Sequence, residues 1–228
     1  MIRRVTSAFV ATVAFVFLLG ALMVPTASAA SAATYGCSIV VAPTVLVDRP
    51  LTSTPVSLGP DCLASGATYA SWDVRHSYYG LSDILIFDHN RSAVNGIYDW
   101  EHYGTYYVQP RNAWNPFWDL TQNTSSYVVK SGSEIGISAA RVGRYVTLSV
   151  ATSYYSPAVR GYRMWPRAPV RLQYRPCPAC SWKYLRNIHM AANGKATFRS
   201  LSPRIRYYRA ASVVTSAIWG RTSATIRR

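Results

Sequence analysis

Residues 170–210, VRLQYRPCPACSWKYLRNIHMAANGKATFRSLSPRIRYYRA, form the stretch that decides the fold. Apolar side chains recur there at every second position: Val170, Leu172 and Tyr174 alternate with arginine and glutamine. A period of two is typical of a half-buried β-strand, whose successive side chains point to opposite faces. Farther on, the dipeptide Asn193-Gly194 predicts a hairpin turn. The stretch therefore indicates β-structure.

The residues around this stretch continue the pattern. The further positions expected to face inward are Val146, Leu148, Val150, Ala196 and Phe198. We also expect Trp182 in the core of this half, and strands at residues 205–210 and 222–227. The alternation does not decide which of Tyr207 and Tyr208 points inward. About seven short strands in about 95 residues predict an antiparallel β-sandwich.

The first half of the chain has the same texture. Residues 69–76 alternate, with Ala70, Trp72 and Val74 on the side expected to be buried. Further strands are predicted at residues 38–42, 44–47, 83–87, 104–109 and 125–130. Turn signals are Gly59-Pro60, Asn95-Gly96 and Asn115-Pro116. No helical period of useful length follows the N-terminal segment, so the sequence predicts an all-β fold.

Residues 1–29 have the features of a signal peptide. Arg3 and Arg4 precede an apolar run at residues 5–24, and Ala27-Ser28-Ala29 offers small residues for cleavage. The alternative is an uncleaved anchor, because twenty apolar residues can span a bilayer. We expect a secreted, extracellular protein associated with the cell envelope, with no transmembrane segment in its mature chain.

Charge divides the 228-residue chain, whose net charge is +15. Residues 30–134 hold all nine acidic side chains and five basic ones, whereas residues 135–228 hold seventeen Lys or Arg and no acid. So abrupt a change predicts two units with different surfaces. We expect a boundary at residues 130–134, with Ser131-Gly132-Ser133 as a hinge. The predicted domains are residues 30–133 and 134–228.

An even number of cysteines in an exported chain favours two disulfides. We favour Cys37–Cys62 and Cys177–Cys180 among the three connectivities. The Cys177-x-x-Cys180 spacing is also that of redox motifs, but those lie where a strand meets a helix, and strands are predicted on both sides here. A zinc site would need another nearby pair of ligands. The sequence therefore predicts no metal and no cofactor.

One further pattern carries a resemblance to a known family. It consists of Val170-Arg171-Leu172-Gln173, then Trp182, then residues 193–198, and then Tyr208-Arg209-Ala210. This pattern resembles the secreted bacterial immunoglobulin-like repeats, most clearly over residues 134–228. The resemblance implies two tandem immunoglobulin-like antiparallel β-sandwiches after the signal peptide. It implies no catalytic residues, because the family shares none.

The basic half gives the strongest indication of function. Seventeen positive charges without an acid attract polyanions through a salt-sensitive, sequence-independent force. The candidate polyanion-binding residues are Arg163, Arg167, Arg171, Arg175, Arg199, Arg204 and Arg206. An anionic surface polymer or a protein partner would satisfy them, or the acidic face of the first half would cover part of them. No module for sequence-specific nucleic acid recognition is visible. The leading hypothesis is a non-enzymatic adhesion or interaction protein of the cell envelope.

Two other classes of function stay open. A secreted enzyme would use the acidic and histidine cluster of residues 83–102, with Asp88 and Glu101 facing each other in a cleft. Strand alternation would place Asp99 and Glu101 on one side and His102 on the other. The oxygen-bearing side chains of Asp83, Asp88 and Asn90 would also suit calcium. A secreted protease inhibitor would use the loop of residues 175–182. No motif of a hydrolase or of a nucleotide-binding loop occurs.

Overall fold

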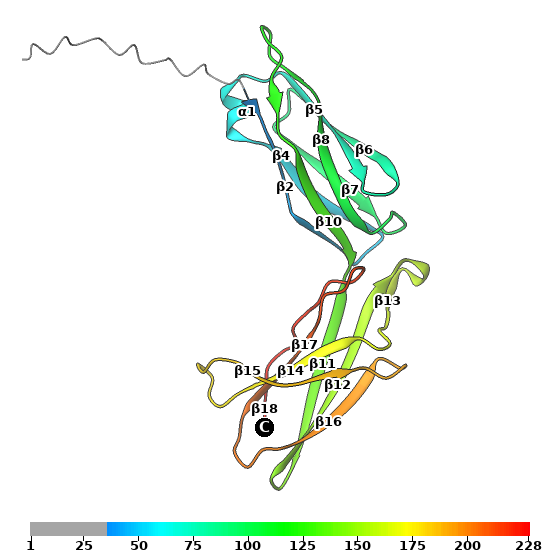
Figure 1. Cartoon of the computed structure of the whole chain (residues 1–228), viewed down its shortest axis with the longest axis vertical. Coiled ribbons are helices and arrows are strands. Elements are labelled where there is room, and N and C mark those ends of the chain that lie inside the picture. The colour runs from blue at the N-terminus through cyan, green and yellow to red at the C-terminus, as the bar shows by residue number, and fades with distance from the viewer. Residues whose placement is uncertain (1–35) are drawn as a thin grey trace, which may run out of the picture. The chain divides into compact units, whose positions relative to one another are not determined.

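The computed structural model describes residues 36–228, and the predicted signal peptide lies outside them. Within the described residues most of the chain is β-strand, arranged in five sheets (Figure 1). The helical segments there are a five-residue α-helix, α1 (Pro60–Ala64), and a single 3-10 turn, η1 (Pro157–Val159). The all-β prediction is therefore confirmed.

Three sheets form from residues 36–131. The five-stranded sheet runs in the order β3 (Thr44–Val47), β10 (Ser125–Ser131), β8 (Gly104–Trp114), β5 (Tyr69–His76) and β6 (Gly80–Asp88). The three-stranded sheet contains β2 (Ile39–Val41), β4 (Leu51–Leu58) and β7 (Ser92–Tyr98). A short pair joins β1 (Gly36–Cys37) to β9 (Thr121–Gln122).

The first hydrophobic core draws on the five-stranded and the three-stranded sheets. Ala70, Trp72 and Val74 of β5 are buried in it, as the alternation predicted. Val56 of β4 and Ile97 of β7 belong to the same core from the three-stranded sheet. Apolar side chains of two sheets thus shield one another from water, which is the main stabilising force of such a layered fold.

Two more sheets form from residues 133–228. The β12 sheet contains β11 (Ser133–Val142), β12 (Tyr145–Ser156), β13 (Gly161–Met164) and β16 (Lys195–Leu201). The β14 sheet runs in the order β15 (Lys183–His189), β14 (Pro169–Arg175), β17 (Tyr207–Ser212) and β18 (Ile226–Arg227). Their common core buries Val146, Leu148 and Val150 from one sheet and Val170 and Leu172 from the other, as predicted.

Three aromatic residues show where this half departs from expectation and what completes its core. Trp182 is only half-buried and lies outside the core, so its predicted place was wrong. Trp165, which is 6% exposed and follows β13, is the tryptophan of this core. Tyr208 is the inward member of its pair, with 1% exposure, and its hydroxyl donates to Ser202 Oγ.

Neither Asn-Gly dipeptide forms the structure that was predicted for it. Asn95-Gly96 lies in the middle of β7, opposite Thr54 and Ser53, because the buried Asn95 amide donates to the Tyr127 hydroxyl at 3.0 Å. Asn193-Gly194 is a turn, with Gly194 at a φ of +69°. However, β15 before it and β16 after it pair with different sheets. The turn therefore connects two sheets and forms no hairpin.

Two other expectations need correction. The sheets are not purely antiparallel, because β3 runs parallel to β10 and β1 runs parallel to β9. The last strand is only Ile226–Arg227, and Thr222 contributes an isolated bridge to Ala211.

No helix within residues 36–228 has the length and apolarity needed to cross a membrane.

The segment expected to be a polar hinge is buried. Ser131 ends β10 and Ser133 begins β11, with exposures of 2% and 0%. The Ser131 hydroxyl donates to the carbonyl oxygen of Tyr155, and the Ser133 hydroxyl donates to that of Trp219, both at 2.6 Å. Hydrogen-bonded serines of this kind hold the backbone in place instead of providing a solvated linker.

Candidate functional site

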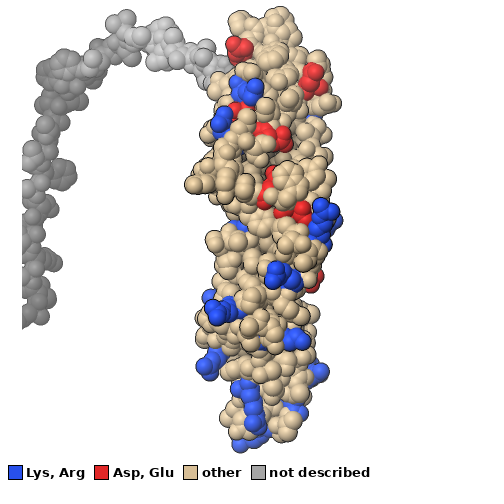
Figure 2. Space-filling view, turned by 90° about the vertical axis from the view of Figure 1, so that its right-hand side faces the viewer, with Lys and Arg blue, Asp and Glu red and all other residues tan. Residues whose placement is uncertain are grey.

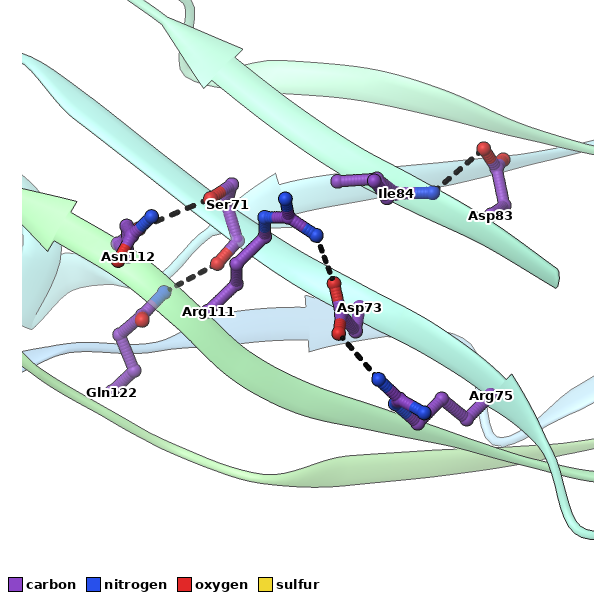
Figure 3. Close-up of polar contacts among 8 residues, drawn as sticks. All are labelled: Ser71, Asp73, Arg75, Asp83, Ile84, Arg111, Asn112 and Gln122. Atoms are coloured by element: carbon purple, nitrogen blue, oxygen red, sulfur yellow. Dashed lines mark hydrogen bonds and ion pairs between the residues drawn. The ribbon is translucent and has the colours of Figure 1, made fainter. Parts of the chain in front are cut away.

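The acidic side chains of the first half neutralise several of its own arginines. Asp73 on β5 accepts hydrogen bonds from Arg111 at 2.8 Å and from Arg75 at 3.0 Å (Figure 3). The hydrogen bond from Arg111 contributes most to lowering the pKa of the Asp73 carboxyl, against the opposing effect of burial. Arg49 is paired with Asp48 in the same way. The first half therefore presents few uncompensated positive charges.

The second half has no such compensation. Among the described residues, every ion pair between a basic group and a carboxylate lies before residue 112. The seventeen Lys and Arg of residues 135–228 therefore pair with no carboxylate there. Figure 2 shows basic side chains and no acidic ones over the lower part of the face that it draws. Such a surface draws anions toward it from solution.

Aromatic rings take the place of acids as partners of these arginines. Seven arginines of this half have the guanidinium carbon 4.1–6.0 Å from the centroid of a ring in the same half. They are Arg163, Arg175, Arg186, Arg199, Arg206, Arg209 and Arg227. A ring holds the planar guanidinium in place without neutralising it, and the N–H donors stay available to bind oxyanions in pairs.

These contacts are most concentrated on the outer face of the β14 sheet. Arg175, Trp182, Tyr207, Arg209 and Arg227 form a group that we term the Trp182 cluster. Arg175 and Arg209 lie over the Trp182 ring at 4.6 and 4.2 Å, and Arg175 and Arg227 lie over the Tyr207 ring at 5.5 and 6.0 Å. Three positive charges are thus collected around two aromatic rings.

Strand register explains why these residues meet. Arg175 of β14 is directly opposite Tyr207 of β17, and Tyr207 is opposite Arg227 of β18. Arg209 follows two positions after Tyr207 and therefore shares its face of the sheet. The opposite face of these strands carries Leu172 and Tyr208, which fill the core. The cluster consequently points away from the core.

Two arginines of the cluster differ in their hydrogen bonds. The Arg209 Nε donates to Gln173 Oε1 at 2.8 Å, which holds the Arg209 side chain beside Gln173 on this face. The Nε of Arg175 is buried without a hydrogen-bond partner among the described residues. A buried donor left unpaired costs free energy.

Both expected disulfides are present, Cys37–Cys62 and Cys177–Cys180. The second closes the loop between the paired strands β14 and β15, and the Cys180 N–H donates to the Cys177 carbonyl oxygen at 3.2 Å. A strand follows this loop, so the helix N-terminus that activates a redox thiol is missing there. The crosslink instead fixes the turn between Arg175 and Trp182.

The seven arginines predicted from the sequence do not form one patch. Arg171 and Arg175 lie on β14, Arg199 lies on β16 over Tyr145, and Arg163 lies on β13 over Tyr154. The other three lie in connections: Arg167 after β13, and Arg204 and Arg206 between β16 and β17. Sequence reasoning missed Arg209 and Arg227, although the spacing of Arg209 from Tyr207 was a usable signal.

The acidic and histidine cluster is arranged differently from the prediction. Glu101 and Asp83 line one cavity, whereas Asp88 is not among its lining residues and pairs with exposed His89 at 2.7 Å. Asp99 is buried and accepts a hydrogen bond from the Tyr155 hydroxyl at 2.7 Å. Residues 99–101 form a turn and bend, so strand alternation does not apply to them. The expected Asp88–Glu101 pair was therefore wrong.

Two further candidate sites find no support in the geometry. Within residues 36–228, no three His, Cys, Asp or Glu side chains are grouped to hold a metal ion. In the loop of residues 175–182, Arg175 is half-buried against Trp182 and Tyr207. A loop that inhibits a trypsin-like protease presents a basic side chain to it, whereas Arg175 packs against these two rings.

In comparisons with known proteins, no protein-family model and no curated protein matches this chain. Among solved structures, native alpha-2-macroglobulin from E. coli is 10% identical over 85% of this chain, with a TM-score of 0.40. The BSP domain of a biofilm associated protein is 10% identical over 83%, with a TM-score of 0.28. This chain spans only 14% and 28% of those two chains. The D0-D1 domain of intimin is 13% identical over 84% of this chain and 96% of its own, with a TM-score of 0.27.

Proposed function

We propose that this chain is an exported, non-enzymatic adhesion or interaction protein of the cell envelope. In this proposal, residues 1–29 are a signal peptide, and residues 30–133 and 134–228 are two tandem immunoglobulin-like β-sandwich domains. The basic second domain contacts an anionic surface polymer or an acidic protein partner. The observation that carries the proposal is that seventeen basic side chains find no carboxylate among the described residues, while seven of them lie over aromatic rings.

The Trp182 cluster is the strongest part of this surface. An arginine free in solution loses side-chain entropy when it binds an anion, whereas an arginine already stacked on a ring has lost part of it beforehand. Arg175, Arg209 and Arg227 are held in this way on one face of one sheet. Tryptophan, tyrosine and arginine are also the residue types that most often dominate binding energies. We therefore assign the main contact to this face.

We expect the full chain to bind a sulfated polysaccharide such as heparin, with an affinity that falls more than about tenfold between about 50 and 200 mM salt. Replacing Arg175 and Arg209 together by alanine is expected to weaken binding about 30-fold, since each basic side chain near an anionic surface contributes about 1 kcal/mol. Titration calorimetry at several salt concentrations measures both effects.

The matched control is the double variant Arg75→Ala and Arg111→Ala. It removes the same charge from the same chain, but both arginines are paired with Asp73. Its affinity should change less than about threefold, because the Asp73 carboxylate already offsets part of their charge. Equal losses in the two double variants would show attraction by net charge alone, and binding that is insensitive to salt would contradict the proposal.

Loss of the Cys177–Cys180 crosslink is expected to weaken polyanion binding several-fold without abolishing it. The crosslink fixes the loop that carries Trp182 past Arg175, so its removal returns conformational freedom to the cluster. The variant with Cys177→Ser and Cys180→Ser isolates this effect, measured by the same titration. An unchanged affinity would show that the loop contributes nothing to the surface.

A further inference from the structure

A second candidate site lies at the opening between the five-stranded and three-stranded sheets. A cavity of about 270 Å³ is lined there by Ser82 and Asp83 of β6, residues 95–98 of β7, and Trp100 and Glu101 of the turn after β7. An adjoining cavity of about 150 Å³ shares Ser82, Trp100 and Glu101 with it. Asn95-Gly96, the dipeptide expected to form a turn, therefore belongs to the wall of this cavity.

Two carboxylates, those of Asp83 and Glu101, belong to this wall. Glu101 accepts the backbone N–H of Tyr98 at 2.9 Å, and Asp83 accepts that of Ile84 at 2.7 Å (Figure 3). The Glu101 carboxylate also accepts a hydrogen bond from the Ser82 side chain. The second oxygen of Asp83, by contrast, has no hydrogen-bond partner among the described residues. No lysine or arginine lines either cavity. Two negative charges in a concave site without a cation favour a positively charged ligand.

Asn95 provides an independent sign of a missing ligand. Its side chain is 2% exposed, and its Oδ1 has no hydrogen-bond partner among the described residues, although its amide donates to Tyr127. A buried carbonyl oxygen without a donor is rare in folded proteins, because its desolvation goes uncompensated. Since Asn95 lines the cavity, a donor group placed there would satisfy it.

Aromatic rings border the same opening. Trp100 is 70% exposed and stacks on Tyr98, with ring centroids 5.3 Å apart and planes inclined by 18°. Tyr79 lines the adjoining cavity and stacks on His102 with centroids 3.5 Å apart. Exposed aromatic faces attract cations and also contact the aliphatic stems that carry them. Acceptors in the cavity and rings at its edge together match a basic side chain.

We propose that the cavity formed by Asp83, Asn95, Trp100 and Glu101 binds the cationic end of a basic side chain, a guanidinium or ammonium group on an aliphatic stem. The carboxylates of Asp83 and Glu101 supply the charge, Asn95 accepts an additional N–H, and Trp100 covers the stem. This site is separate from the Trp182 cluster and takes a ligand of the opposite charge. Two sources offer this chemistry: an arginine of a second copy of this chain, and a basic segment of another protein.

The first experiment titrates the peptide acetyl-Gly-Arg-Gly-amide into the full chain at about 20 mM salt, where exposed charges are weakly screened. NMR follows the indole N–H signal of Trp100. We expect saturable binding, and at least about tenfold weaker binding of the peptide in which citrulline replaces arginine, because citrulline has a similar shape without the charge. Equal binding of the two peptides, or no shift of the Trp100 signal, would overturn the proposal.

Variants of the chain make the test specific. Glu101→Gln and Asp83→Asn should each weaken binding of the arginine peptide about tenfold, since each removes a charge-assisted partner. Asp88→Asn is the matched control, because Asp88 is an exposed acid outside both cavities. If one of these two variants destabilises the fold, the other still tests the site. If Asp88→Asn loses as much affinity for the arginine peptide as Glu101→Gln does, the peptide is attracted by net charge and the proposed site is contradicted.

Sedimentation of the full chain distinguishes the two sources. If a second copy supplies the arginine, the wild-type chain associates at about 20 mM salt, and Glu101→Gln abolishes the association. If another protein supplies it, the wild-type chain stays monomeric while it binds the arginine peptide. If association persists in Glu101→Gln and the arginine peptide does not bind, the proposal that this cavity binds a basic side chain is contradicted.

Discussion

Replacing Trp72 by alanine is expected to lower the free energy of unfolding by about 3–5 kcal/mol, as for other fully buried large aromatics. Trp72 is 0% exposed in the centre of the first core and packs edge-to-face on Phe87 at 5.9 Å. Its Nε1 also donates to the carbonyl oxygen of Asn123 at 3.0 Å. The substitution therefore leaves both a cavity and an unpaired acceptor. Urea unfolding, followed by circular dichroism, measures the change.

Two companion variants separate these contributions. Trp72→Phe keeps much of the packing and loses the hydrogen bond, so its cost should be smaller than that of alanine. Trp100→Ala removes a tryptophan that is 70% exposed and should change stability by no more than about 0.5 kcal/mol. Similar losses for Trp72→Ala and Trp100→Ala would mean that the first core is not centred on Trp72.

Removal of the Cys37–Cys62 disulfide is expected to lower the free energy of unfolding by about 3 kcal/mol. The two cysteines are 25 residues apart and 0% exposed, and they connect β1 to α1. Without the bond the unfolded chain gains the freedom of that loop, which stabilises the unfolded state. The double variant Cys37→Ala and Cys62→Ala, unfolded in urea beside the wild-type chain, gives the value.

The second disulfide provides the comparison. Cys177 and Cys180 are three residues apart, so the same loop-entropy relation gives only about 1–2 kcal/mol for their bond. We therefore expect the variant lacking Cys177–Cys180 to be the more stable of the two double variants. The opposite order would indicate that the short crosslink stabilises the native state directly. Its expected influence on polyanion binding is independent of this order.

Local patterns in the sequence were enough to predict the buried side of several strands. Ala70, Trp72 and Val74, like Val146, Leu148 and Val150, recur every second residue, and a strand has only two faces. By contrast, β4 (Leu51–Leu58) was missed, because it is rich in hydroxyl residues and contains Pro55. Proline and polar residues weaken the strand signal, and the pairing of β4 with both β2 and β7 overrides it.

Trp182 and Asn95 show where local patterns mislead. A tryptophan between strands predicts a core residue on average, yet Trp182 lies between Arg175 and Arg209 on the outer face of a sheet. Asn-Gly predicts a turn on average, yet Asn95 is held in β7 by a hydrogen bond to Tyr127, 32 residues away. Both outcomes depend on partners that are distant in sequence, which propensity does not include.

The sequence by itself determined the β-rich character of this chain and the concentration of seventeen unbalanced basic residues after residue 134, but it left three pairings of its four cysteines open. Only the tertiary structure decided which side chains act together. Arg175 meets Tyr207 and Arg209 through the register of β14 with β17, and Asp83 meets Glu101 at the edge of the first core. Composition and alternation are properties of single segments, whereas a binding surface arises from the pairing of segments far apart in the chain.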